Sequence, residues 1–180
     1  MAQTSTVHNF EIALSDTDRG VYEDLSLKVA RHPSEATEYM VARVLAYSIE
    51  HQEGLAFTQG LAVADEPALW VRDLTGRLEA WIEVGTPDAA RLHKATKACG
   101  RVAVYCHKDI AAYLRALAGQ RIHAPERLEL VELDRAFVAA LSAKVEKRTR
   151  MALSITEGQL YADIGGESYT ATLHRHGLTS

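Results

Sequence analysis

The stretch of residues 64–94 contains carboxylates whose spacing could place them at one metal ion. Its pattern predicts a β-hairpin, and counting outward from the turn places Glu83 opposite the segment Asp65–Pro67. Asp65, or Glu66 in its place, would then lie at the same open end as Glu83. Facing carboxylates repel each other, and a cation would remove that repulsion. Two hard oxygen donors, with water completing an octahedron, suit Mg²⁺ or Mn²⁺.

Glu83 is the more informative of these acids. It ends a strand that is otherwise apolar on its inner side, where an unpaired carboxylate is costly to bury. The alternative to metal binding is that Glu83 is partly exposed, or paired with Arg72 or Arg91. For Asp65 the alternative is a plain turn, because the letters ADEP also form a turn signal.

Another acid is expected from the helix predicted over residues 34–51, with Ser34 as its cap and Glu35 in its first turn. Glu38 shares a helical stripe with three apolar residues, Ala42, Leu45 and Ile49. We therefore expect Glu38 to point along the packed side, with Glu35 one turn earlier and close to the same stripe. Either acid could complete the carboxylate site, or could instead pair with His32 or Arg43.

A basic helix is predicted directly after the hairpin, over residues 87–99. Lys94 and Lys97 are three residues apart, so they are neighbours on its surface, and His93 lies beside them. An ammonium group near a metal ion would neutralise charge at a scissile phosphate, and a metal-bound water would supply the nucleophile. This combination predicts phosphodiester hydrolysis.

The composition limits the class of partner and the cellular compartment. The chain has 180 residues, a net charge of −4 and a pI of about 6.1, whereas dedicated nucleic-acid binders carry a basic excess. A nucleic acid would therefore have to contact local basic patches, which are Arg91, His93, Lys94, Lys97 and Arg101, or the run Lys144–Arg150. The two cysteines suggest a reduced, cytoplasmic compartment. Neither a signal peptide nor a membrane span is predicted.

The order of predicted elements indicates a mixed α/β fold in a single domain of residues 1–180. Strands fill residues 1–31, and residues 34–107 hold a helix (34–51), three strands (55–84), a second helix (87–99) and a strand (101–107). Residues 108–180 hold further helices and a β-rich tail. The sheet is therefore expected to be mixed, with antiparallel strands at both ends of the chain.

Several of these segments resemble the YaeQ family of small bacterial proteins: VARHPSEATEYM, LAFTQGL, DEPALWVRD and WIEVGTPDAARLHKA, followed by the β-rich tail. The resemblance covers Phe10 to about His176. It implies a variant of the PD-(D/E)XK, restriction-endonuclease-like fold, whose core is a helix, a three-stranded meander, a helix and a strand. The elements predicted at 34–107 have this order.

The resemblance also implies roles for single residues. Asp65 would be the aspartate before the second core strand, Glu83 the acid of the (D/E)XK element, and Glu38 or Glu35 an extra acid on the first core helix. Asp65, Glu83 and Glu38 would then hold the metal. Gly85 stands where the motif has lysine.

The following helix could supply that amine through Lys94, with His93 and Lys97 as weaker candidates. The implied function is Mg²⁺-dependent hydrolysis of nucleic acid, and the alternative is a non-catalytic regulatory or binding module on a nuclease-derived fold. The sequence specifies no protein partner.

Overall fold

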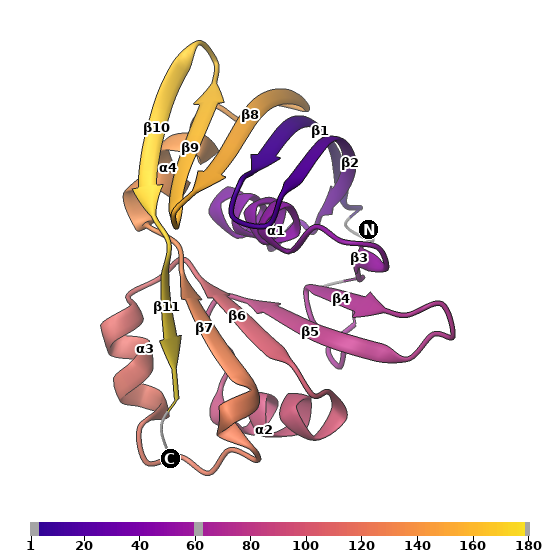
Figure 1. The fold of residues 1–180 in the computed structure, drawn as a ribbon, viewed down its shortest axis with the longest axis vertical. Coiled ribbons are helices and arrows are strands. Elements are labelled where there is room, and N and C mark those ends of the chain that lie inside the picture. The colour runs from indigo at the N-terminus through magenta and orange to yellow at the C-terminus, as the bar shows by residue number, and fades with distance from the viewer. Residues whose placement is uncertain (1–3, 60–62, 179–180) are drawn as a thin grey trace. The chain divides into compact units, whose positions relative to one another are not determined.

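The computed structural model describes residues 4–59 and 63–178 and has the mixed α/β class predicted from the sequence (Figure 1). Its strands form two mixed sheets. The chain divides into two compact units, Met1–Val41 with Asp134–Leu173, and Ala42–Leu133 with His174–Ser180. A single domain of residues 1–180 stays a prediction. No helix within the described residues is long and apolar enough to cross a membrane.

The first unit is built on a five-stranded sheet of order β10-β9-β8-β1-β2. Its elements are β1 (Thr6–Asp16), β2 (Val21–Arg31), α4 (Arg135–Ser142), β8 (Arg148–Thr156), β9 (Gln159–Ile164) and β10 (Glu167–Thr172). The alternation of apolar and polar residues that predicted strands here buries one side of β1, through Phe10, Ile12 and Leu14. β1 pairs antiparallel with β2 and parallel with β8, which joins the two ends of the chain.

The second unit is built on a six-stranded sheet of order β11-β7-β6-β5-β4-β3. Its strands are β3 (Leu55–Phe57), β4 (Leu69–Arg72), β5 (Leu78–Val84), β6 (Val102–Cys106), β7 (Leu128–Glu132) and β11 (His174–Gly177). Its helices are α2 (Ala89–Ala98), α3 (Ile110–Leu117) and a 3₁₀ turn at Pro125–Arg127, and α1 (Thr37–Glu50) begins in the first unit and continues into the second. The bend predicted at Gly60 lies outside the described residues.

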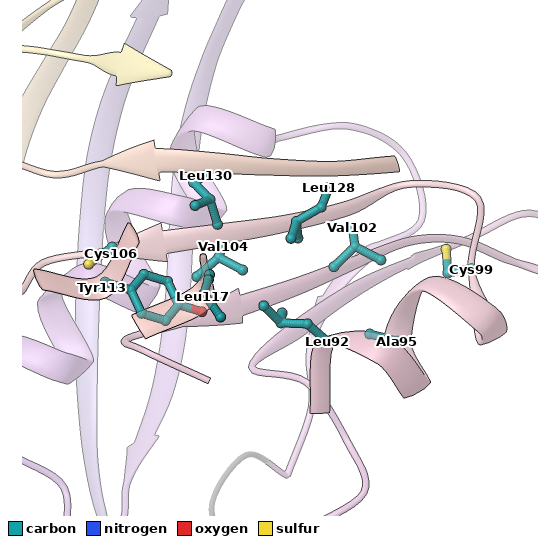
Figure 2. Packing of buried hydrophobic residues seen from close by; sticks show 10 residues of the cluster. All are labelled: Leu92, Ala95, Cys99, Val102, Val104, Cys106, Tyr113, Leu117, Leu128 and Leu130. Atoms are coloured by element: carbon teal, nitrogen blue, oxygen red, sulfur yellow. The ribbon is translucent and has the colours of Figure 1, made fainter. Parts of the chain in front are cut away.

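Strands β5, β6 and β7 run parallel, and α2 and α3 are the crossovers between them. Both helices contribute to one apolar cluster with β6 and β7 (Figure 2). In Figure 2, Tyr113 and Leu117 of α3 gather with Cys106 at one end of this cluster, and Leu92 and Ala95 of α2 lie at the other. All of β6 is buried, as its continuous apolar run predicted.

Two local predictions are wrong. Helix α1 begins at Thr37, so Ser34 does not cap it and Glu35 precedes its first turn. The reason is a competing turn, in which the backbone N–H of Glu35 donates to the carbonyl of His32. The last predicted β segment also divides at Leu173, whose N–H donates to the carbonyl of Gly158. As a result β10 and β11 belong to different sheets.

Candidate functional site

Glu83 lies one residue before the end of β5 and is only 4% exposed. In the parallel ladder it stands beside Val104 of β6, whose side chain belongs to the apolar cluster under α2 and α3. Burial raises the pKa of Glu83 above its ordinary value, while hydrogen bonds from Trp81 and Arg91 act in the opposite direction. A buried carboxylate at the carboxyl end of a parallel strand is therefore present, as the sequence suggested.

The positive partner of this carboxylate is Arg91, in the first turn of α2. Its Nε donates to Glu83 Oε1 over 2.8 Å, and the indole N–H of Trp81 donates to the same oxygen over 2.8 Å. Asp88 caps the helix by accepting the backbone N–H of Arg91 over 2.8 Å. The alternative pairing of Glu83 with Arg91 is thus confirmed, whereas Arg72 stacks over the Trp70 ring at 4.3 Å.

Arg91 also holds the turn that carries the other predicted acid. Its Nη1 donates to the carbonyl of Ala64 over 2.5 Å and its Nη2 to the carbonyl of Glu66 over 2.6 Å. The guanidinium therefore links Glu83 to the backbone on both sides of Asp65. A cation does join these two parts of the chain, and it is the side chain of arginine.

Asp65 and Glu66 do not face Glu83 across the hairpin ladder. The ladder ends at the pair Leu69↔Ile82, and its register shifts between Val71 and Arg72. The bulge shifts the count from the turn by one residue, so that the register continued past the ladder places Ala68 opposite Glu83, and Asp65 and Glu66 lie beyond it. The side chain of Asp65 is exposed, and that of Glu66 accepts the backbone N–H of Gln59 over 3.1 Å.

The two acids of the 34–51 segment belong to the first unit. Glu38 is exposed, so the expectation that it points along the packed side is wrong. It stands in the first turn of α1, one turn before the buried stripe begins at Ala42. Glu35 is buried, and its carboxylate accepts the backbone N–H of His32 over 3.1 Å. Their participation in one site with Asp65 and Glu83 stays a prediction.

The predicted amines lie on α2 beyond Arg91. Lys94 and Lys97 are both exposed. His93 Nδ1 accepts the backbone N–H of His123 over 3.0 Å, which ties α2 to the segment before β7. The pKa of His93 is lowered, first by desolvation and then by the positive charges of Lys97, Arg121 and His123.

The backbone at Gly85, where the resemblance implied that a lysine could be expected, adopts a conformation that favours glycine. Gly85 has a φ of 96°, a backbone conformation that residues other than glycine rarely adopt. Its N–H donates to the carbonyl of Tyr105 over 2.9 Å. A lysine at this position would strain the junction between β5 and the helix that follows.

A divalent metal does not fit this arrangement as it stands. Across the part of the chain that the structure describes, no three His, Cys, Asp or Glu side chains gather closely enough to hold a metal ion. Both hydrogen bonds to Glu83 fall on Oε1, and one of them comes from a full positive charge. Binding of Mg²⁺ or Mn²⁺ stays a prediction, and at Oε1 it would compete with Arg91 and Trp81.

Another buried carboxylate, that of Glu50, was not identified from the sequence. Glu50, the last residue of α1, accepts two hydrogen bonds of 2.8 Å from Arg101 and one of 2.6 Å from the Tyr105 hydroxyl. Burial acts to raise the pKa of Glu50, but the bonds and charge of Arg101 bring it below its ordinary value. The available signal was an acid that ends an otherwise apolar helix, where the helix dipole disfavours it unless a cation is near.

Comparison with known proteins agrees with this fold. The profile of the YaeQ protein family matches residues 1–173. The YaeQ proteins of Escherichia coli and Salmonella typhi are each 33% identical to the chain over 162 residues, which is 89% of this chain and 90% of theirs.

Two crystal structures are similar to the whole chain. YaeQ from Xanthomonas axonopodis pv. citri has a TM-score of 0.87 and 32% identity, and the match covers 98% of this chain and 100% of that one. YaeQ from Pseudomonas syringae has a TM-score of 0.85 and 32% identity, with 99% and 98% covered. The matched sequence and the shared fold span nearly the whole chain, which therefore belongs to the YaeQ family.

Proposed function

We propose that this protein is a non-catalytic binding or regulatory module on a nuclease-derived fold. The order of α1, β3, β4, β5, α2 and β6 supports the fold part, because it is the helix, three-stranded meander, helix and strand of the restriction-endonuclease-like core. The observation that carries the functional part is Arg91. It supplies to Glu83 the positive charge that a metal would supply in an active nuclease.

Three features of the site support the absence of turnover. Glu83 is buried against Arg91 and Trp81, Gly85 cannot be replaced by lysine without strain, and Lys94 is exposed. A metal bound at Glu83 Oε1 would compete with the guanidinium, which also holds the carbonyls of the 64–66 turn. Breaking a buried ion pair commonly costs about 3–5 kcal/mol, less here because a third of the Arg91 side chain is exposed.

A hydrolysis assay tests this proposal. Single- and double-stranded DNA and RNA are incubated with Mg²⁺ or Mn²⁺ and either the wild type or Glu83→Gln, purified in parallel. We expect no cleavage by the wild type beyond that of the variant. Metal-dependent cleavage that disappears in Glu83→Gln would overturn the proposal, because it would make Glu83 part of a working centre.

Calorimetry with Mg²⁺ and Mn²⁺ gives an independent measurement on the same site. We expect no saturable binding to the wild type at millimolar metal. Saturable binding that Asp65→Ala or Glu83→Gln abolishes would instead identify the two acids as ligands.

The second candidate function is a metal-dependent phosphodiesterase, with Asp65, Glu83 and Glu38 as metal ligands and Lys94 as the amine. The observation in its favour is that a buried acid with a raised pKa stands at the end of the central strand β5, where the resemblance to the endonuclease core expects one. The hydrolysis assay separates this candidate from the first.

A nucleic-acid partner is proposed through the exposed lysines Lys94 and Lys97 of α2. Phosphate contacts through surface lysines weaken as salt rises. Fluorescence anisotropy with labelled single- and double-stranded oligonucleotides should show salt-dependent binding that Lys94→Glu with Lys97→Glu removes. Equal binding by the double variant would exclude this surface.

A cytoplasmic location is also proposed, supported by the free, buried thiols of Cys99 and Cys106.

A further inference from the structure

A pocket of about 610 Å³ lies in the second unit, on residues that the Glu83–Arg91 pair does not use for its contacts, apart from the capping residue Asp88. Its lining comes from the segment between β5 and α2 with the first turn of α2, and from α3 with the residues just before and after it. The lining residues are Thr86, Pro87, Asp88, Ala89, Ala90, Lys108, Asp109, Ala112, Tyr113, Ala116, Leu117 and Gln120. Small-molecule sites are commonly 300–1,000 Å³ in volume, so the size suits a single small ligand.

The pocket follows from the sequence of α3. The lining positions 109, 112, 113, 116 and 117 are separated by three, one, three and one residues, which places them on one stripe of α3 and its N-cap, and Gln120 follows the end of the helix. Tyr113 and Leu117 on this stripe are buried in the apolar cluster, as Figure 2 shows. Ala112 and Ala116 are exposed and short, so the outer part of the stripe stays open.

The floor of the pocket is held by a tertiary contact between its two sides. The Tyr113 hydroxyl donates to the carbonyl of Pro87 over 2.6 Å. This bond fixes the segment after β5 against α3 without filling the space above the alanines. The shape is therefore formed in the folded protein before any ligand arrives, which lowers the entropy cost of binding.

The charged side chains of the lining sum to one negative charge, which the positive N-terminal ends of α2 and α3 offset in part. Asp88 and Asp109 are the N-caps of α2 and α3, and each uses Oδ1 to accept a backbone N–H, from Arg91 over 2.8 Å and from Ala112 over 3.1 Å. Lys108 brings one positive charge against these two negative ones. The pKa of Tyr113 is raised, first by burial and then by nearby acidic groups that include Asp88, so its hydroxyl stays protonated and remains a donor to Pro87.

We infer that this pocket binds a small amphipathic amine, whose apolar body lies over Ala112, Ala116 and the Pro87 wall and whose ammonium group is paired by Asp88 and Asp109. The apolar lining supplies affinity by excluding water, and the two carboxylates select the charge. The inference goes beyond the proposed function, because the pocket's occupancy does not depend on whether Glu83 supports hydrolysis.

The test uses three probes with one ring and one two-carbon linker: phenethylammonium, 2-phenylethanol and 3-phenylpropionate. They differ in charge, which is positive, zero and negative. Binding is measured by saturation-transfer NMR and by amide shift titration of the full chain. We expect phenethylammonium to bind roughly fivefold tighter than 3-phenylpropionate at low salt, with the alcohol between them.

Two substitutions on α3 test the location. Ala116→Leu fills the pocket, while Ala111→Leu adds the same group to an exposed position of the helix outside the lining. Leucine is a good helix former at both sites, and circular dichroism checks the fold. We expect Ala116→Leu to weaken phenethylammonium binding about tenfold and Ala111→Leu to change it less than about twofold.

Substitutions at the caps test the charge selection. Asp88→Asn and Asp109→Asn keep a capping side chain but remove the negative charge, and Asp134→Asn makes the same change at the cap of α4 in the other unit. The double variant Asp88→Asn, Asp109→Asn should lose the preference for the cation, and Asp134→Asn should retain it. Equal or tighter binding of 3-phenylpropionate to the wild type, or binding unaffected by Ala116→Leu, would overturn the inference.

Discussion

Two buried glutamates of the second unit, Glu50 and Glu83, each pair with an arginine, yet the two pairs differ in kind. Their exposures are similar, with arginine and glutamate side chains 40% and 6% exposed in one pair and 34% and 5% in the other. Arg101 donates to both oxygens of Glu50, whereas Arg91 and Trp81 both donate to one oxygen of Glu83. Geometry, rather than burial, distinguishes them.

The difference appears in how each arginine uses its remaining donors. Two nitrogens of the Arg101 guanidinium donate to Glu50, so this pair anchors the end of α1 to the start of β6. Arg91 gives two nitrogens to carbonyls of the 64–66 turn, so its pair tethers a loop. The pKa of Glu50 is lowered and that of Glu83 is raised. The same two residue types therefore form a structural anchor at Glu50. At Glu83, by our proposal, the arginine supplies the positive charge that a metal would supply in an active nuclease.

The largest effect is expected at the anchor. Arg101→Met would leave the Glu50 carboxylate buried with only the Tyr105 hydroxyl, and the free energy of unfolding should fall by about 2–3 kcal/mol, a value reduced for the exposure of Arg101. Urea denaturation measures it. Adding Glu50→Gln to Arg101→Met should recover part of the loss. A smaller loss than that of Arg91→Met would contradict the distinction between the pairs.

Removing one hydroxyl should have the next largest effect. Tyr105→Phe deletes a buried donor to an ionised carboxylate, and such bonds contribute about 1.5–3 kcal/mol. Tyr113→Phe is the matched control, because its hydroxyl donates to the neutral carbonyl of Pro87, and it should cost about 1 kcal/mol. Equal losses in thermal or urea unfolding would show that the charge of Glu50 adds nothing to its bond.

Loss of the tether should be milder for stability but visible locally. Arg91→Met should lower the free energy of unfolding by about 1–2 kcal/mol, since Glu83 can take up a proton when its cation is removed. Amide hydrogen exchange of residues 63–68 should become faster, because Arg91 no longer holds the carbonyls of Ala64 and Glu66. Lys94→Met, on the exposed face of α2, is the control and should leave both measurements unchanged.

The smallest effect is a difference in pH dependence. A lowered pKa means that Glu50 contributes stability above its ordinary value of 4.5, which is lost as the pH falls through the folded pKa. A raised pKa means that ionising Glu83 costs stability as the pH rises from 4.5 through its folded pKa. Relative to wild type, Glu50→Gln should therefore become less stable with rising pH, and Glu83→Gln more stable.

Unfolding free energies measured from well below pH 4.5, where the Glu50 contribution is lost, up to about pH 7 should separate the two variants by about 1 kcal/mol. The sign of the change matters more than its size. If both variants followed the same trend with pH, the contrast between anchor and tether would be wrong.

The local elements of this protein were predictable because they depend on neighbours in sequence. Alternating apolar residues placed β1 and β2, and the run of residues 101–107 became the buried strand β6. The hairpin turn formed as expected around Gly76, which has a φ of 86°, with Asp73 accepting backbone N–H groups of Thr75 and Arg77.

The candidate site was predictable only in part. Glu83 is the buried acid that its strand pattern indicated, and Arg91 was one of its two expected partners. The residue opposite Glu83 was not predictable, because the bulge at Glu79 of β5 shifts the register by one residue and the ladder ends before Asp65, which a count outward from the turn cannot show. Glu38 was misplaced for a related reason, since a stripe that is buried in mid-helix need not be covered at the first turn.

By itself, the sequence determined the order of helices and strands, the family, and the presence of a buried acid at the end of β5, because periodicity and turn chemistry act over a few residues. The tertiary structure decided which cation reaches each acid. Glu50 and Arg101 are 51 residues apart, and Arg91 reaches carbonyls 25 and 27 residues away. Such contacts depend on how the chain closes in space, so only the folded structure could decide between Arg91 and the other expected partners of Glu83.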